Sequence, residues 1–146
     1  MGSWYARGKE SGGSLLIMLA FVYGSLKEGF GNHGVLGDSP LEGKASLISN
    51  SKLVSLGSFP AVVKDQLEDT AILGEVYKVD DKALTRLDRL EGNGSFYNRE
   101  LRDITMSENG AQRKAWVYFL MSDYGEEVNH LAIDSSNRKV YSWTRD

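Results

Sequence analysis

One stretch of this 146-residue chain has the periodicity of an amphipathic helix, and the segments around it resemble strands. Residues 80–91 (DDKALTRLDRLE) place Leu84, Leu87 and Leu90 along one stripe, the spacing of a helix that faces a core. The stretch opens on two aspartates, which suit an N-cap and the positive end of the helix dipole. Gly92 follows as a C-terminal stop. One clear helix among strands predicts an α+β fold.

The strand-like segments are short and separated by glycine-rich or charged turns. We expect strands within residues 15–23, 45–56, 71–79, 97–105, 113–120 and 139–143, a short apolar piece at 61–63 before a charged turn at 64–69, and a helical turn near 33–36. Gly74, inside a predicted strand, marks a bulge or a close approach of two backbones. A turn at residues 108–110 joins two strands into a hairpin. Together these segments predict a small curled sheet or barrel.

The chain contains no cysteine, which excludes disulfides, thiolate-zinc sites and cysteine nucleophiles. That composition fits a reducing compartment, so we expect a cytoplasmic protein. The net charge is -3 without a basic cluster, which argues against nucleic acid as a partner. His33 and His130 are far apart in the sequence and no carboxylate cluster accompanies them, so we expect no metal and no cofactor. The oligomeric state is not predicted.

Residues 15–23 (LLIMLAFVY) form the longest apolar run, which is too short for a bilayer span of roughly 20 residues. A signal peptide is the alternative, because the run follows Arg7 and Lys9, but no Ala-x-Ala site comes after it. We interpret the run as a buried first strand of a single domain over residues 15–146. Residues 1–14 are then a flexible leader, from an expression tag or an upstream start, with Met18 as an alternative first residue.

Glu91 stands out because it shares a helix face with two leucines. It lies four residues beyond Leu87 and seven beyond Leu84, so a helix directs its carboxyl group toward the core. Desolvation there raises the pKa of a carboxyl group, and such a group can move protons near neutral pH. The alternative is a frayed helix end at which Glu91 turns out to water.

The second candidate is the tetrapeptide Tyr23-Gly24-Ser25-Leu26, which follows the first strand. A strand that runs into Gly-Ser can expose successive backbone N–H groups as an anion- or oxyanion-binding concavity. Read alone, the tetrapeptide is a weak signal, because most Gly-Ser pairs after a strand are plain turns.

Taken in order, these motifs resemble the gamma-glutamylcyclotransferase-like family, most closely its gamma-glutamylamine cyclotransferase and plant avirulence-induced branch. The resemblance is carried by FVYGSLK at 21–27 with Gly29, Asn32-His33 and Val35-Leu36, by GEVY at 74–77 with Val79-Asp80, by LDRLEG at 87–92, by YNR at 97–99 and by Val117-Tyr118. It covers roughly residues 18–120. Many relatives have proline after the glutamate where this chain has Gly92-Asn93-Gly94-Ser95, which predicts a looser turn here.

The resemblance implies a small mixed β-barrel-like sheet with flanking helices, a substrate loop at residues 23–26 and Glu91 as catalytic acid/base. It also implies a substrate, a small gamma-glutamyl compound, whose own α-amine attacks its γ-carbonyl to give 5-oxoproline and a free amine. The protein then needs to fold the substrate, stabilise an oxyanion and move one proton.

Two tyrosines are further candidates for the substrate pocket. Tyr97 begins a predicted strand after the helix, with Arg99 on the same strand face, and Tyr118 lies in the next strand. The alternatives are core packing for both tyrosines and a structural role for Arg99.

Two other functions remain open at this point. One is cleavage of a different gamma-glutamyl-tagged metabolite, such as an acyl carrier intermediate. The other is a small-metabolite-binding member of the fold with weak or no turnover.

Overall fold

The centre of the protein is a closed barrel of five strands, seen in a computed structural model that describes residues 18–24, 33–64, 68–122 and 125–143. In order around the barrel, the strands are β1 (Met18–Val22), β5 (Thr70–Val79), β2 (Leu41–Ser49), β6 (Tyr97–Met106) and β7 (Gln112–Leu120). Strand β1 closes the barrel, because it pairs antiparallel with β5 and parallel with β7, where Ala20 lies opposite Trp116. Because the barrel is closed, each of these five strands is hydrogen-bonded to a neighbouring strand on both sides.

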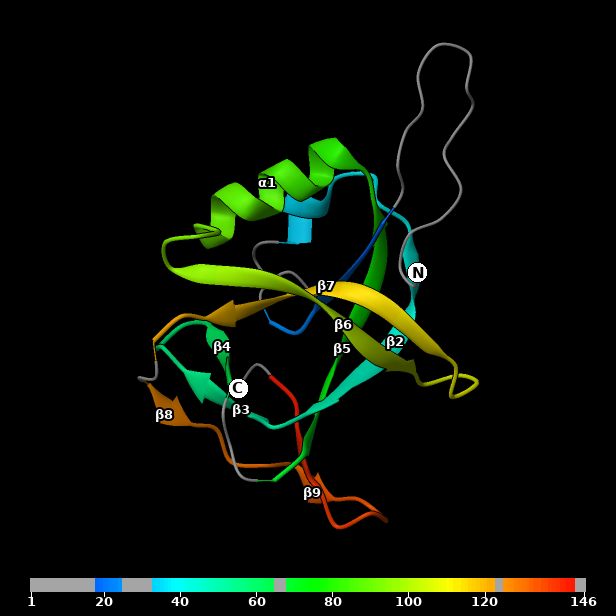
Figure 1. The fold of residues 1–146 in the computed structure, drawn as a ribbon, viewed down its shortest axis with the longest axis vertical. Helices are drawn as coiled ribbons and strands as arrows, with labels where there is room; N and C mark the ends of the chain where they lie inside the picture. Colours follow the sequence, from blue (N-terminus) through cyan, green and yellow to red (C-terminus); the bar gives the residue numbers. More distant parts are fainter. Residues whose placement is uncertain (1–17, 25–32, 65–67, 123–124, 144–146) are drawn as a thin grey trace.

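Further strands extend from two sides of the barrel (Figure 1). On one side are β3 (Ser51–Ser55), β4 (Pro60–Lys64) and β8 (Glu126–Glu127), and on the other are β10 (Lys139–Tyr141) and β9 (Ala132–Ile133). The β3–β4 hairpin joins the barrel through β4, whose Val62 pairs with Phe119 of β7. Strand β10 runs parallel to β5. The hairpin forms one wall of the candidate site described below.

The single α-helix of the described residues, α1 (Asp81–Glu91), lies across the outside of the barrel with the 3-10 helix η1 (His33–Leu36) beside it (Figure 1). The Arg86 Nε atom donates a hydrogen bond to the Val35 carbonyl over 2.9 Å and joins the two helices. The predicted α+β barrel is confirmed.

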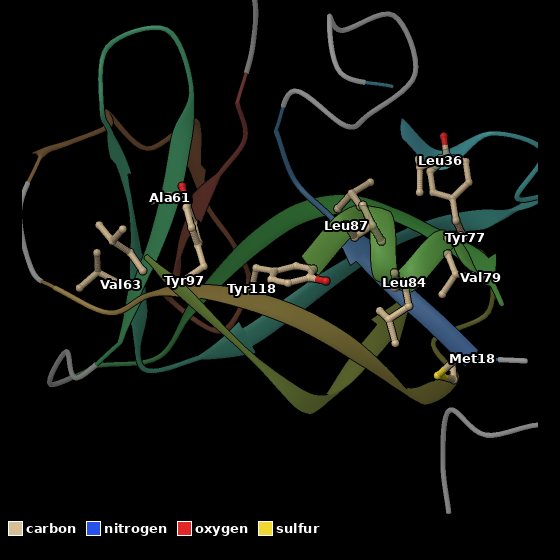
Figure 2. Packing of buried hydrophobic residues seen from close by; sticks show 14 of the residues in the cluster. Met18, Leu36, Ala61, Val63, Tyr77, Val79, Leu84, Leu87, Tyr97 and Tyr118 are labelled. Atoms are coloured by element: carbon tan, nitrogen blue, oxygen red, sulfur yellow. The ribbon is translucent and has the colours of Figure 1, made fainter. Parts of the chain in front are cut away.

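Strand β1 is buried on both faces, which explains its unbroken apolar sequence. Leu19 and Phe21 belong to a cluster with residues from all five barrel strands and fill the interior. Met18, Ala20 and Val22 belong to a second cluster, which reaches from Leu84 and Leu87 of α1 to Ala61 and Val63 of β4 (Figure 2). The prediction of a buried first strand is confirmed for the described residues.

The predicted helix ends are both present. The Asp80 carboxylate accepts a hydrogen bond from the Ala83 N–H over 2.9 Å, and Gly92 adopts a left-handed conformation with φ 61°. The predicted stripe is wrong at Leu90, which is 42% exposed, whereas Ala83, Leu84 and Leu87 are buried. A residue six positions beyond Leu84 is rotated to the edge of that face, while Glu91, seven beyond, is aligned with it.

The remaining predictions concern Gly74, the bounds of the strands and residues 1–14. Gly74 is a close approach rather than a bulge, since a Cβ atom there would lie 2.5 Å from the Val22 carbonyl oxygen. Residues 45–56 hold parts of two strands, of which β2 begins earlier than predicted, and Lys64 ends β4 instead of opening a turn. The proposed leader at residues 1–14 lies outside the described residues, and nothing tests it. Within the described ranges, the helices are too short and too polar to cross a bilayer.

Candidate active site

Five of the predicted site residues surround one cavity of about 220 Å³. The cavity opens between the C-terminal end of α1, the end of β1, the starts of β4 and β6, and the later part of β7. Its lining consists of Phe21, Val22, Tyr23, Gly24, Phe59, Pro60, Leu90, Glu91, Phe96, Tyr97 and Tyr118. Ser25 and Leu26, the other predicted members of the substrate loop, lie outside the described residues. Residues far apart in the chain therefore meet here.

Glu91 supplies the only carboxyl group among the described lining residues. As the last residue of α1, it follows buried Leu84 and Leu87 on the helix face that packs on the barrel. Burial raises the pKa of its carboxyl group from 4.5 to about 7. The predicted inward orientation is confirmed, and the group can exchange a proton near neutral pH.

Two buried tyrosines hold β4 against the barrel at the edge of the cavity. The Tyr23 hydroxyl donates a hydrogen bond to the Tyr118 carbonyl over 2.7 Å and accepts one from the Val62 N–H over 3.3 Å. The Tyr97 hydroxyl donates to the Pro60 carbonyl over 3.3 Å. Burial, with smaller contributions from Tyr97 and Glu91, raises the pKa of Tyr23 well above its usual value. The Tyr23 phenol is therefore a neutral structural donor at physiological pH.

Tyr118 is linked to the helix that carries Glu91. Its hydroxyl donates to the Asp88 Oδ1 atom over 2.5 Å, and the Arg99 Nε atom donates to the same oxygen over 2.8 Å. The Arg99 guanidinium lies 4.2 Å from the ring centroid of Trp116, a cation–π contact. Burial and the hydrogen bond to Asp88 raise the pKa of Tyr118. The expected structural role of Arg99 is supported, and Tyr118 both lines the cavity and anchors the helix.

Gly24 has a packing role that the sequence did not indicate. A Cβ atom at this position would lie 2.6 Å from the Pro60 Cγ atom, closer than real side chains approach. Gly24 therefore allows the end of β1 to meet the start of β4, and this contact shapes one wall of the cavity.

The turn after α1, which we expect to be looser than its proline-containing counterparts, is closely hydrogen-bonded. The Asn93 N–H donates to the Asp88 carbonyl over 2.9 Å and the Gly92 N–H to the Arg89 carbonyl over 3.4 Å, the pair of bonds of a Schellman motif. The Phe96 N–H donates back to the Gly92 carbonyl over 2.9 Å. The positive φ angles of Gly92 and Gly94 allow this path, since glycine adopts them without strain.

The aromatic rim of the cavity was not predicted from the sequence. Phe59 and Phe96 line it, although neither lies in a predicted element. Asp88 belongs to the same motif as Glu91, but no function was predicted for it. Its position three residues before Glu91 could have indicated a function, because residues three apart on a helix are neighbours.

His, Asp and Glu side chains in the described part of the chain do not gather into groups of three that could hold a metal ion. The side chain of His33 lies outside the described part of the structure. Lys, Arg and His are absent from the described lining of the cavity. An anionic substrate group must therefore meet backbone N–H groups, hydroxyls or residues outside the described ranges.

Comparison with known proteins identifies the family. The model of the family described as gamma-glutamyl cyclotransferase, AIG2-like, matches residues 20–142. The chain belongs to this family. The match extends beyond the region of resemblance in the sequence and includes β10.

Relatives of the family agree in sequence and in fold. A Methanocaldococcus jannaschii protein, provisionally named a gamma-glutamylcyclotransferase, is 35% identical over 83% of this chain and 95% of its own. The gamma-L-glutamyl-butirosin B gamma-glutamyl cyclotransferase of Niallia circulans is 30% identical over 76% of this chain and 72% of its own. The crystal structure of a mouse AIG2-like protein superposes with a TM-score of 0.66 at 25% identity, covering 84% of this chain and 95% of the mouse chain.

Proposed function

We propose that this family member converts a small gamma-glutamyl amine or gamma-glutamyl amino acid into 5-oxoproline and a free amine. The substrate's α-amine attacks its own γ-carbonyl, which forms the ring C–N bond. The tetrahedral intermediate then collapses and the original amide C–N bond breaks. Two protons leave the α-nitrogen, one before the attack and one after the ring closes, and two reach the departing nitrogen, which leaves as an ammonium group, so the reaction needs no external co-reactant.

The observation that supports this proposal most strongly is Glu91 at the cavity, with the pKa of its carboxyl group raised to about 7. A group with that pKa is substantially ionised at neutral pH and still a competent acid once protonated. We assign Glu91 to accept the proton from the α-ammonium group and to return it to the leaving nitrogen. Because the nucleophile belongs to the substrate, proton transfer of this kind and positioning are what the protein must supply.

The loop at residues 23–26 is assigned to the oxyanion or the substrate carboxylate. Gly24 lies at the cavity and leads into Ser25 and Leu26, whose backbone N–H groups would complete the site. The Tyr97 and Tyr118 rings are proposed walls for the glutamyl chain. Folding the substrate against these walls brings the amine to its carbonyl, and such positioning contributes several kcal/mol to catalysis, on the order of 7 or more in favourable cases.

A panel of gamma-glutamyl amines and dipeptides tests the proposal, with 5-oxoproline measured by chromatography. We expect stoichiometric 5-oxoproline and free amine from at least one class, with no added metal. Binding of the same compounds is measured in parallel by calorimetry. Binding without 5-oxoproline across the panel would contradict the proposal and favour a small-metabolite-binding protein on the same fold.

The cytoplasm is the location that we propose for this activity. The absence of cysteine from the chain suits a reducing compartment. The proposed partner is the small substrate alone, without nucleic acid or membrane.

A further inference from the structure

Glu91 lies between two residues that are hydrogen-bonded to each other and to the same third residue. The Asn93 N–H donates to the Asp88 carbonyl over 2.9 Å and folds the chain back onto the last turn of α1. The Asn93 Oδ1 atom accepts a hydrogen bond from the backbone N–H of Arg99 over 3.0 Å. The Arg99 Nε atom donates to the Asp88 Oδ1 atom over 2.8 Å. Asp88, Asn93 and Arg99 therefore form a closed triangle of hydrogen bonds around the segment that carries Glu91.

The Arg99 corner of this triangle belongs to the barrel. Arg99 lies in β6 opposite Tyr118 of β7, and its guanidinium lies 4.2 Å from the Trp116 ring centroid. Strand β2 pairs with β6 only at the opposite end of β6, so it does not reach the Arg99 N–H that is bonded to Asn93. The triangle thus ties the end of α1 to a fixed point of the sheet rather than to another loop.

The attachment acts on Glu91 from both sides in the sequence. Asp88, three residues before it, is bonded to β6 and β7 through Arg99 and Tyr118. Asn93, two residues after it, is bonded to β6 through its own side chain. That side chain is exposed and is not part of the described cavity lining. Asn93 can therefore affect the cavity only through the backbone that it holds.

A group that transfers a proton must be held within roughly 0.5 Å of its productive position. We infer that Asn93 is a positioning residue for Glu91, because its side-chain oxygen keeps the end of α1 closed against β6 and the Glu91 carboxyl group at the cavity. Without that bond the helix end can fray, and the carboxyl group can turn out to water. The inference rests on the proposed function, in which Glu91 moves the proton, and deepens it by naming a residue on which that step depends.

Two substitutions of Asn93 test the inference. Asn93→Ala removes the acceptor oxygen, whereas Asn93→Asp keeps an acceptor at the same place. We expect kcat for 5-oxoproline formation to fall by about 10- to 100-fold in Asn93→Ala, because a displacement of about 1 Å can cost about a hundredfold. KM should change little, since the lost interaction acts on the proton transfer and not on binding. Asn93→Asp should recover most of the wild-type kcat.

Asn109→Ala is the matched control. Asn109 also precedes a glycine, and its Oδ1 atom accepts a hydrogen bond from the Ala111 N–H over 2.9 Å. It lies in the β6–β7 turn, at the far end of β6 from the cavity. Asn109→Ala should lower the melting temperature about as much as Asn93→Ala does, and leave kcat unchanged. An unchanged kcat in Asn93→Ala, or an equal fall of kcat in both variants, would overturn the inference.

The pKa of Glu91 separates this inference from the proposed function, because its measurement needs no substrate. The Glu91 carboxyl carbon is followed by NMR through a pH titration of the wild type, Asn93→Ala and Asn109→Ala. We expect a pKa of about 7 in the wild type and in Asn109→Ala, and a pKa nearer 4.5 in Asn93→Ala, where water reaches the carboxyl group. That lower pKa, together with a wild type that makes no 5-oxoproline, would contradict the proposed function and retain the positioning role. An unchanged pKa of Glu91 in a folded Asn93→Ala variant would overturn the inference, whatever the rate of turnover.

Discussion

The Tyr118 hydroxyl and the Asp88 carboxylate, 2.5 Å apart, join the barrel to the last turn of α1. Asp88 lies one turn before Glu91, and its Oδ1 atom also accepts a hydrogen bond from Arg99. Strands β6 and β7 supply the two donors, so both strands are tied to the helix end that carries the proposed acid/base. The position of the Glu91 carboxyl group thus depends on Asp88.

Asp88 and Tyr118 should be energetically coupled. Hydrogen bonds to a charged group contribute roughly 1.5–3 kcal/mol, so we expect a coupling free energy of about 1–2 kcal/mol in a cycle of Asp88→Asn, Tyr118→Phe and the double variant. Denaturant unfolding of the four proteins measures it. Thr85→Ala with Tyr118→Phe is the control cycle, because Thr85 is an exposed residue on the same helix. Additive effects in the Asp88 cycle would show that the bond does not anchor the helix.

The rate of the reaction should depend on the ionisation of Glu91. The carboxylate form accepts the proton, and the pKa of the group is about 7. We therefore expect kcat/KM to rise with pH along a one-proton limb with a midpoint near 7. The measurement is the pH profile of 5-oxoproline formation. A midpoint near 4.5, the value of a solvated glutamate, would show that burial does not tune this group.

The contribution of Glu91 to the free energy of unfolding should fall as the pH rises, whereas the rate of the reaction should increase. The raised pKa means that the folded protein holds a proton on Glu91 that the unfolded chain has lost, between pH 4.5 and about 7. Glu91 therefore stabilises the fold fully below pH 4.5, and this contribution is lost as the pH rises through about 7. Relative to Glu91→Gln, the wild type should lose on the order of 2–3 kcal/mol of unfolding free energy between pH 4.5 and 8.

Urea unfolding of both proteins across this pH range measures the difference. The contributions of the other titrating groups cancel in this difference, because the two proteins share those groups. A constant difference between the two curves would mean that Glu91 is solvated in the folded state.

Gly74→Ala should destabilise the barrel. The added methyl group would lie 2.5 Å from the Val22 carbonyl oxygen and 2.6 Å from the Phe21 ring, both inside closely packed structure. Overpacking of this kind costs about 1–3 kcal/mol. Gly34→Ala is the matched control, since a Cβ atom there has no neighbour within 4 Å. Thermal unfolding compares the two variants, and equal melting temperatures would contradict the packing of β1 against β5.

Local sequence patterns predicted the elements better than their assembly. Asp80 and Gly92 bounded the helix correctly because caps are local signals. Helical spacing directed Glu91 toward the core but left a solvent-facing helix end open, and the resemblance to the family decided between the two. Leu90 was misplaced, because the width of a buried face depends on what packs on it.

Long-range contacts were beyond the reach of those patterns. The closing pair of Ala20 and Trp116 joins residues far apart in the chain, and no local feature specifies it. Phe59 reaches the candidate site only after the β3–β4 hairpin docks on β7, and Phe96 reaches it from the turn between α1 and β6. The packing of Gly24 on Pro60 has the same origin.

The turnover of Glu91→Gln is the most direct test of the proposed mechanism. The substitution keeps the size of the side chain and removes its ability to accept a proton. With a gamma-glutamyl amine as substrate, we predict a kcat about 10²–10⁴-fold below that of the wild type. Circular dichroism at the same pH should show an intact fold. A folded variant that releases 5-oxoproline at the wild-type rate would contradict the assignment of Glu91 as the acid/base.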